Sequence, residues 1–227
     1  MFNSPNKSVG VIKGAPPQGK NLIINGNLTV DQRGVYTEYV ADRWKIVDAN
    51  NMTQIIEDKN FEPSTEYTLS WEGGTPQQIT SPASGHWTLP NIPRTARKIQ
   101  LEKGDEATEF EWEDYGTTLA KCQRYFYRIV GRASGYKHNG YILANFSVPQ
   151  FRDIPVITVI DFGGYESSNN GARANYTPSN LSQGIYDHGG RGITLRLQGG
   201  TWSSFVPTDG SGIWGSGIYF ADAEIAP

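Results

Sequence analysis

The sequence predicts an all-β protein in which two β-sandwich domains of jelly-roll type are joined by one short α-helix. Turn-forming residues are abundant, with 26 Gly and 13 Pro among 227 residues, and aromatic residues, which favour strands, make up 12%. Short segments of alternating polarity recur at intervals of ~8–12 residues, separated by Gly-, Pro- and Ser-rich clusters, which is typical of antiparallel β architectures. Only one segment has the periodicity of a helix.

The N-terminal segment 1–20 is expected to be an extended arm. It contains three Pro residues and no sustained periodicity, so we expect it to become ordered only against a partner or a neighbouring subunit. Its first residues include no apolar stretch, which indicates that the arm is not a secretory signal.

Residues 21–114 are expected to form the first sandwich. Within segment 41–47, alternation places Trp44 and Ile46 on one strand face. Gly- and Pro-rich clusters between the expected strands predict turns. The expected elements are a strand–turn–strand unit over 21–30 with its turn at Asn25-Gly26, and strands within 41–47, 52–57, 67–71 and 98–102.

Carboxylates are frequent at the end of this first domain. Alternation places Glu109, Glu111 and Glu113 on one face of an expected strand, and Phe110 and Trp112 on the opposite face. Glycan cleavage needs two carboxylates that flank the scissile bond. We interpret this pattern instead as a solvated face above a packed one.

Residues 115–130 predict a helical connector. The helix is expected over 117–129, with a threonine at its N-cap and Arg124 and Arg128 near its C-terminal end, where the helix dipole favours cations. Apolar residues recur at helical spacing and form one stripe. The stripe consists of Leu119, Cys122, Phe126 and Ile129.

Residues 131–227 predict a second β domain. Its loops 163–182 and 199–215 are long and rich in Gly, Ser and Asn, and long loops on a β scaffold are frequently functional. The expected strands lie within 141–148, 155–160, 193–198 and 216–225.

Charge and composition exclude several kinds of partner. The net charge is −3, from 20 basic and 23 acidic residues scattered along the chain, so no concentrated basic face is expected and nucleic acid is excluded as a main partner. No stretch approaches the ~18 apolar residues of a membrane helix, which argues against membrane insertion. Cys122 is the only cysteine, so neither an intramolecular disulfide nor a cysteine zinc site is possible.

No catalytic residue, cofactor or metal ligand is expected. The three histidines, His86, His138 and His188, fall in or near expected turns, and no nucleophile motif or metal-binding spacing accompanies them. The thiol of Cys122 falls on the apolar helix face, where we expect inert packing. We therefore expect that the protein is not an enzyme.

Three parts of the sequence resemble tail-fibre and receptor-binding proteins of tailed bacteriophages. The tyrosine-rich helix and the order of the three parts carry the resemblance, which covers roughly residues 21–130. The parts are 21–27 (NLIINGN) followed by 32–34 (QRG) and 41–44 (ADRW), then 99–104 (IQLEKG) followed by 107–111 (ATEFE), and finally 119–126 (LAKCQRYF).

The resemblance implies a trimeric fibre protein. In such proteins the first two parts look like the opening and closing strands of a sandwich similar to carbohydrate-binding modules. The third begins the connector to a C-terminal β domain, 131–227 here. A homotrimer would bury the stripe of Leu119, Cys122, Phe126 and Ile129 on a threefold axis, whereas packing of the stripe on its own chain is the alternative.

This chain departs from the family in one respect. The segment between Trp44 and Lys98 is shorter than in sandwiches of this type. The missing surface is where a sugar site normally lies, so we expect the first domain to act as a scaffold.

Candidate binding residues gather in and beside the expected C-terminal loops. Aromatic rings present apolar faces to the C–H groups of sugars, and polar neighbours fix the orientation of a ligand. Trp202 and Trp214 have an alternative role as anchors in a trimer core. The candidates are Tyr165, Tyr176, Tyr186, Asp187, His188, Arg191, Trp202 and Trp214.

The expected function is structural and adhesive. The homotrimer would belong to a tail fibre or other virion appendage, made in the host cytoplasm without a signal peptide. Residues 1–20 would attach it to another virion protein, and the C-terminal domain would bind a host surface glycan or an outer-membrane receptor. The alternatives are a purely structural fibre or collar protein and, less favoured, a glycan-degrading tail enzyme.

Overall fold

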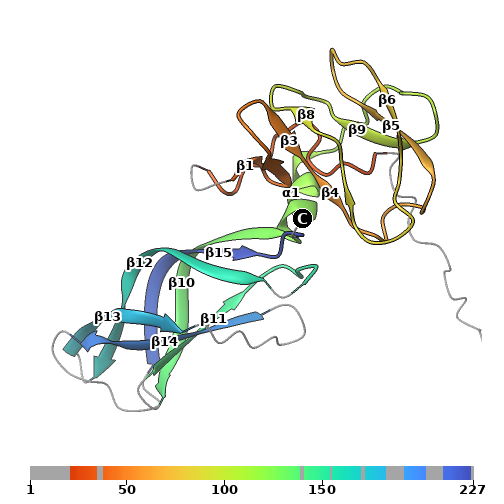
Figure 1. The fold of residues 1–227 in the computed structure, drawn as a ribbon. Coiled ribbons are helices and arrows are strands. Elements are labelled where there is room, and N and C mark those ends of the chain that lie inside the picture. The colour runs from red at the N-terminus through yellow and green to blue at the C-terminus, as the bar shows by residue number, and fades with distance from the viewer. Residues whose placement is uncertain are drawn as a thin grey trace, which may run out of the picture.

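The computed structural model describes residues 21–34, 38–138, 141–153, 155–169, 172–182, 192–202 and 212–225. Within these ranges the chain forms fifteen strands and a single α-helix, which confirms the predicted all-β class. Figure 1 shows two β regions, with the helix α1 and the C-terminal end of the chain lying where they meet. The expected N-terminal arm, residues 1–20, lies outside the described residues.

The first β region contains three small antiparallel sheets. The first has the order β1 (Tyr39–Ala41), β2 (Trp44–Ile46), β3 (Asn51–Thr53), β8 (Ile92–Pro93). The second pairs β4 (Ile55–Ile56) with β7 (Trp87–Thr88), and the third has the order β6 (Gln77–Thr80), β5 (Glu66–Ser70), β9 (Gln100–Lys103). The strands expected within 52–57, 67–71 and 98–102 coincide with β3 and β4, with β5 and with β9. The stacking of the sheets as a sandwich stays a prediction.

One apolar core joins the three sheets. Trp44 of β2 and Leu69 of β5 are fully buried in it. Trp87 of β7 packs edge-on against Phe61 and Tyr67, with ring centroids 5.4 and 5.2 Å apart. These contacts place β2, β5 and β7 around one core.

The strand–turn–strand unit expected over 21–30 is wrong, because this segment is a loop around a turn. The side-chain oxygen of Asn25 accepts hydrogen bonds from the N–H groups of Thr29 and Val30, at 2.9 and 3.1 Å. Its amide nitrogen donates to the carbonyls of Val30 and Asp42. An asparagine that occupies neighbouring backbone groups in this way competes with strand pairing.

The single strand expected over 41–47 is also wrong, because the chain reverses within it. Asp42 and Arg43 form a tight turn between β1 and β2, and Arg43 has a φ of 75°. Alternation continues across the turn, which is why the pattern resembled one strand. Arg43 is buried where it pairs with Glu224 of the second β region, and the carboxylate of Asp42 is bound by Gln32, which in turn donates to the carbonyl of Phe126.

The carboxylate-rich segment 105–114 forms no strand, contrary to the interpretation of its alternation. Its backbone is held by a side chain instead, since Gln100 donates to the carbonyl of Glu109 and accepts from the N–H of Glu111. Trp112, expected on a packed face, is 67% exposed.

Helix α1 (Tyr115–Gln123) is shorter than the predicted helix and begins earlier. Asp114, rather than a threonine, is the N-cap, and its side chain accepts from the N–H of Thr117 at 3.0 Å. The helix ends before Phe126, where β10 begins. Phe126 and Ile129 therefore lie in a strand that pairs with β15, so the expected helical stripe is not formed.

The second β region is a closed antiparallel barrel, not the expected sandwich. Its strands follow the order β10-β11-β14-β13-β12-β15, with β15 closing onto β10. A closed barrel has no unpaired strand edge, which removes a site of edge-to-edge aggregation. The strands are β10 (Phe126–His138), β11 (Tyr141–Ser147), β12 (Val156–Asn169), β13 (Ala172–Ser182), β14 (Gly192–Trp202) and β15 (Gly212–Asp222).

The strands expected in this region are confirmed, but most of the expected loop residues are strand. Much of the expected loop 163–182 is the end of β12 and the whole of β13. The expected loop 199–215 includes the ends of β14 and β15, and residues 203–211 lie outside the described ranges. Gly and Ser weaken strand propensity, but pairing on both sides in a closed barrel outweighs that preference.

Gly26 tests the packing of loop 21–30. A Cβ atom at this position would collide with the carbonyl oxygen of Ile99, which is backbone and cannot rotate away. We expect Gly26→Ala to lower the free energy of unfolding by about 2 kcal/mol, measured by urea denaturation. Gly116→Ala, in the first turn of α1, is the control and should change stability by less than about 1 kcal/mol. Equal effects of the two variants would contradict this account.

Candidate functional site

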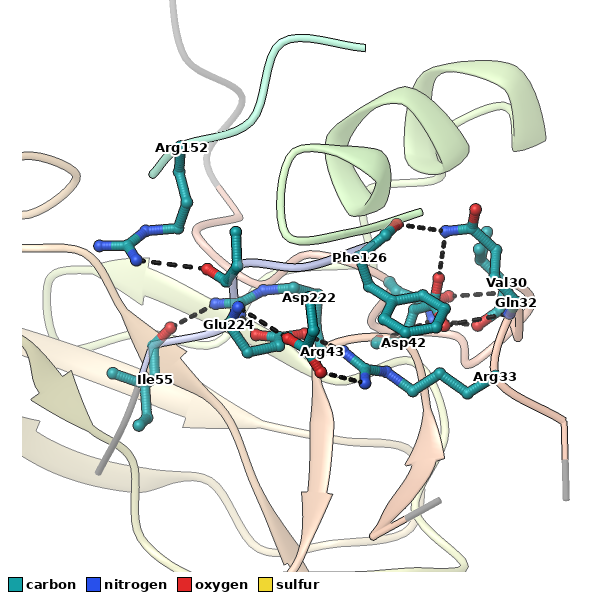
Figure 2. Close-up of polar contacts among 12 residues, drawn as sticks. Val30, Gln32, Arg33, Asp42, Arg43, Ile55, Phe126, Arg152, Asp222 and Glu224 are labelled. Atoms are coloured by element: carbon teal, nitrogen blue, oxygen red, sulfur yellow. Dashed lines mark hydrogen bonds and ion pairs between the residues drawn. The ribbon is translucent and has the colours of Figure 1, made fainter. Parts of the chain in front are cut away.

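A buried cluster of charges joins the two β regions. Arg33 and Arg43 come from the first region, and both contact Glu224, which follows β15. Arg33 also pairs with Asp222 at the end of β15, with Nη1 and Oδ2 2.8 Å apart. Figure 2 shows the two guanidiniums converging on these carboxylates. We call this set of residues, together with Asp42 and Gln32, the junction cluster.

Aromatic rings cover the guanidinium groups. The guanidinium of Arg33 lies 3.7 Å from the ring centroid of Phe126 and 4.0 Å from that of Tyr39. The guanidinium of Arg43 lies 3.6 Å from the ring centroid of Tyr125. A planar, weakly hydrated cation can be buried against such faces more readily than an ammonium group.

Asp42 and Gln32 connect the cluster to the start of the barrel. Asp42 accepts from the backbone N–H and the side-chain Nε2 of Gln32, at 3.0 and 2.5 Å. The same Nε2 donates to the carbonyl of Phe126 at 3.0 Å, as Figure 2 shows. Burial raises the pKa of Asp42 from its ordinary value of 3.8 to about 6.

Apolar and backbone contacts continue the junction. Ile55, Tyr125 and Ile225 form a small buried core. The N–H of Ala223 donates to the carbonyl of Tyr125 at 2.7 Å. Arg152, from the segment before β12, binds Glu57 of the first region at 2.6 Å. Contacts therefore connect the two regions at three places, which are the ion pairs of Glu224, the core around Ile55 and the pair of Arg152 with Glu57.

The junction cluster holds the two regions together. Each of its carboxylates is engaged by a guanidinium or by Gln32. The Nε atoms of Arg33 and Arg43 have no hydrogen-bond partner among the residues described. Arg43 Nη2 donates to the carbonyl of Ile55 at 2.5 Å, so this guanidinium also ties β4 to the cluster.

The segments that carried the family resemblance meet at or beside this junction. Segments 32–34 and 41–44 supply the four junction residues Gln32, Arg33, Asp42 and Arg43. Segment 119–126 ends at Phe126, whose carbonyl accepts from Gln32. Segment 99–104 packs against the first one, since the Asn21 side chain accepts from the N–H of Leu101 at 3.0 Å. These segments therefore build the fold, and Glu224, which pairs with Arg33 and Arg43, was not among the residues singled out from the sequence.

Three of the aromatic candidates form a row on the barrel. In the strand register Tyr165 of β12 lies opposite Tyr176 of β13, and Tyr176 lies opposite Trp202 of β14. Trp214 of β15 lies opposite Ser134 and Glu166, so it does not belong to this row. Sequence analysis placed all four in loops or beside them, whereas all four lie in strands. The remaining candidates, Tyr186, Asp187, His188 and Arg191, lie outside the described residues.

The residues of the expected trimer stripe are mostly buried within one chain. Cys122, Phe126 and Ile129 are 0%, 1% and 8% exposed, and Leu119 is half-buried. Cys122, Phe126 and Ile129 therefore pack on their own chain, which was the alternative to burial in a trimer. Burial also raises the pKa of the Cys122 thiol well above its ordinary value, which disfavours a nucleophilic thiolate.

The described side chains include no group of three or more His, Cys, Asp or Glu residues that could hold a metal ion. The one helix in the described ranges is too short to cross a membrane. Comparisons with protein-family models, curated proteins and solved structures find no match to this chain.

Removing the carboxylate of Glu224 should lower the free energy of unfolding, because it breaks the ion pairs that connect the two β regions. Glu224→Ala leaves two buried guanidiniums short of their shared carboxylate, and breaking a buried ion pair in this way typically costs about 3 kcal/mol or more. We expect a loss of that size in urea unfolding. Glu62→Ala removes the exposed pair with Lys103 and should cost less than about 1 kcal/mol. A similarly small loss for Glu224→Ala would contradict the role given to the cluster.

The buried carboxyl group of Asp42 predicts a pH dependence of stability. Its folded-state pKa of about 6 lies above its ordinary value of 3.8, so folding takes up a proton between these values. Its contribution to stability is thus fully present below pH 3.8 and is lost as the pH rises through 6. Asp42→Asn, compared with wild type by urea unfolding, should gain about 2 kcal/mol more at pH 7 than at pH 4.

Asp48→Asn provides the control of opposite sign. Hydrogen bonds from Asn51 and Asn50 hold the pKa of Asp48 below its ordinary value, so its stabilising contribution is lost as the pH falls. Relative to wild type, this variant should fare better at low pH. The same direction of change in both variants would show that Asp42 is not the group responsible.

Proposed function

We propose that this protein is a structural and adhesive component of a bacteriophage tail fibre or other virion appendage. The observation that carries the proposal is the buried junction cluster, whose ion pairs connect a closed barrel to the first β region. An appendage must keep its shape outside the cell, and this chain has no disulfide to help it. Ion pairs, aromatic stacking and a closed barrel supply that rigidity by other means.

In this proposal the barrel is the tip that binds a host surface glycan or outer-membrane receptor. The aligned positions of Tyr165, Tyr176 and Trp202 support this assignment, because directly opposed residues in antiparallel strands are nearest cross-strand neighbours. A row of aromatic residues suits the apolar faces of sugar rings. Tyr186, Asp187, His188 and Arg191 belong to the proposed site through their place in the sequence.

The proposal includes a homotrimer that attaches to another virion protein through residues 1–20. Three chains would multiply the contacts of each tip with a cell surface. A purely structural role is the second candidate. It is supported by segments 32–34 and 41–44, because their residues Arg33, Gln32 and Arg43 are engaged within the junction cluster.

Attachment to host cells tests the adhesive role. We expect the purified, fluorescently labelled protein to decorate host cells as a trimer, with its mass determined by light scattering in the same sample. Trp202→Ala should reduce attachment at least tenfold, because an aromatic contact with the glycan is lost. Tyr115→Ala removes an exposed ring from α1 and should leave attachment unchanged. Both variants should keep the wild-type mass and unfolding midpoint.

Other results would redirect or overturn the proposal. Normal attachment of Trp202→Ala would show that the site assignment is wrong. A trimer that binds none of the host cells tested would favour the purely structural role. Deletion of residues 1–20 should then prevent incorporation of the protein into particles. A monomer would overturn the fibre proposal.

A further inference from the structure

A groove lies on the first β region, between loop 21–29, segment 110–114 and helix α1. Its volume is about 660 Å³, within the range of sites that hold small organic ligands. Asn27, Asn60, Trp112 and Arg124 are among the residues that line it. The groove is separate from the junction cluster, none of whose charged residues lines it.

Trp112 provides this groove with an exposed aromatic surface. Its side chain is 67% exposed, and two neighbours lie against the ring. Phe110 packs edge-on against it, with centroids 5.2 Å apart and ring planes at 88°. The Nζ of Lys98 lies 5.8 Å from its centroid. A ring that is already oriented loses little conformational entropy when it stacks on a ligand.

Asn27 and Asn60 supply polar groups that are not otherwise used. Both are half-buried, and neither side chain makes a hydrogen bond within the part of the chain that the structure describes. Each amide offers two donors and one acceptor. Asn21, which also lines the groove, differs because its amide is occupied by Ile23, Ile99 and Leu101. Amides that are half-buried and unpaired favour a ligand rich in hydroxyl groups.

The carboxylates of the groove are engaged by partners within the chain. Glu113 pairs with Lys121, Asp114 caps the helix through Thr117, and Glu111 accepts from the N–H of Asn21 at 3.1 Å. Arg124 adds one further cation to the lining. Because the lining contains both acidic and basic side chains, it favours neither a strongly anionic nor a strongly cationic ligand.

We propose that this groove binds a neutral oligosaccharide. A sugar ring stacks its C–H face on Trp112, and its hydroxyl groups exchange hydrogen bonds with the amides of Asn27 and Asn60. The site is independent of the aromatic row on the barrel and does not require the protein to be a virion component. It gives the first β region a binding role that sequence analysis did not assign, because Trp112 was expected to be packed.

The test is titration calorimetry of the full chain with defined sugars. The neutral probes are maltotriose, cellotriose and chitotriose, and sialyllactose is the charged comparison. We expect at least one neutral probe to bind with a dissociation constant of ~1 mM or tighter, and sialyllactose to bind at least tenfold more weakly. Trp112→Ala should weaken the neutral interaction at least tenfold, and Asn27→Ala and Asn60→Ala should each weaken it severalfold.

Two controls separate this site from other aromatic surfaces. Tyr115 is 59% exposed on the adjoining helix but does not line the groove, so Tyr115→Ala should bind like wild type. Trp202→Ala should also keep this interaction, even where it loses attachment to cells. Because Trp112 is exposed, its variant should keep the wild-type unfolding midpoint. Failure of every neutral probe to bind, or unchanged binding by Trp112→Ala, would overturn the proposal.

Discussion

The carboxylate of Glu224 is the interaction on which the arrangement of the two β regions depends. It lies near the C-terminal end of the described chain, yet it binds two guanidiniums from the opposite end, those of Arg33 and Arg43. A buried guanidinium without an anionic partner carries a large desolvation cost. The loop that contains Arg33 and the segment that contains Glu224 therefore stabilise each other. Loss of either one leaves a buried charge without its partner, which lowers the free energy of unfolding.

Aromatic rings explain how two cations can be buried so closely. Phe126 and Tyr125 adjoin each other at the start of β10, and their rings face Arg33 and Arg43 respectively. The rings belong to the barrel side of the junction and the cations to the other side, so the stacking itself connects the two regions. Charge-assisted hydrogen bonds depend on geometry more strongly than apolar contacts do, so the paired charges add to the specificity of the orientation of the two regions.

Sequence patterns predicted the fold class and many strands because alternation depends on local burial. They failed where long-range contacts decided the structure. The helical periodicity of Phe126 and Ile129 was lost to pairing with β15, and the alternation around Trp112 was lost to side-chain contacts from Gln100. The turn at Asp42 and Arg43 was hidden because both residues are polar and buried, a combination that follows only from partners distant in sequence.

Rigidity at the junction also has a consequence for binding at more than one surface. The groove beside α1 and the aromatic row on the barrel lie in different β regions, and the junction lies between those regions (Figure 1). Two weak sites on one chain bind a surface cooperatively only when their separation allows both to be engaged together. A flexible connection between the regions would allow many distances between the two sites. The ion pairs of Glu224 with Arg33 and Arg43 restrict that distance. In the proposed adhesive function, residues of the junction cluster would influence attachment without contacting any ligand.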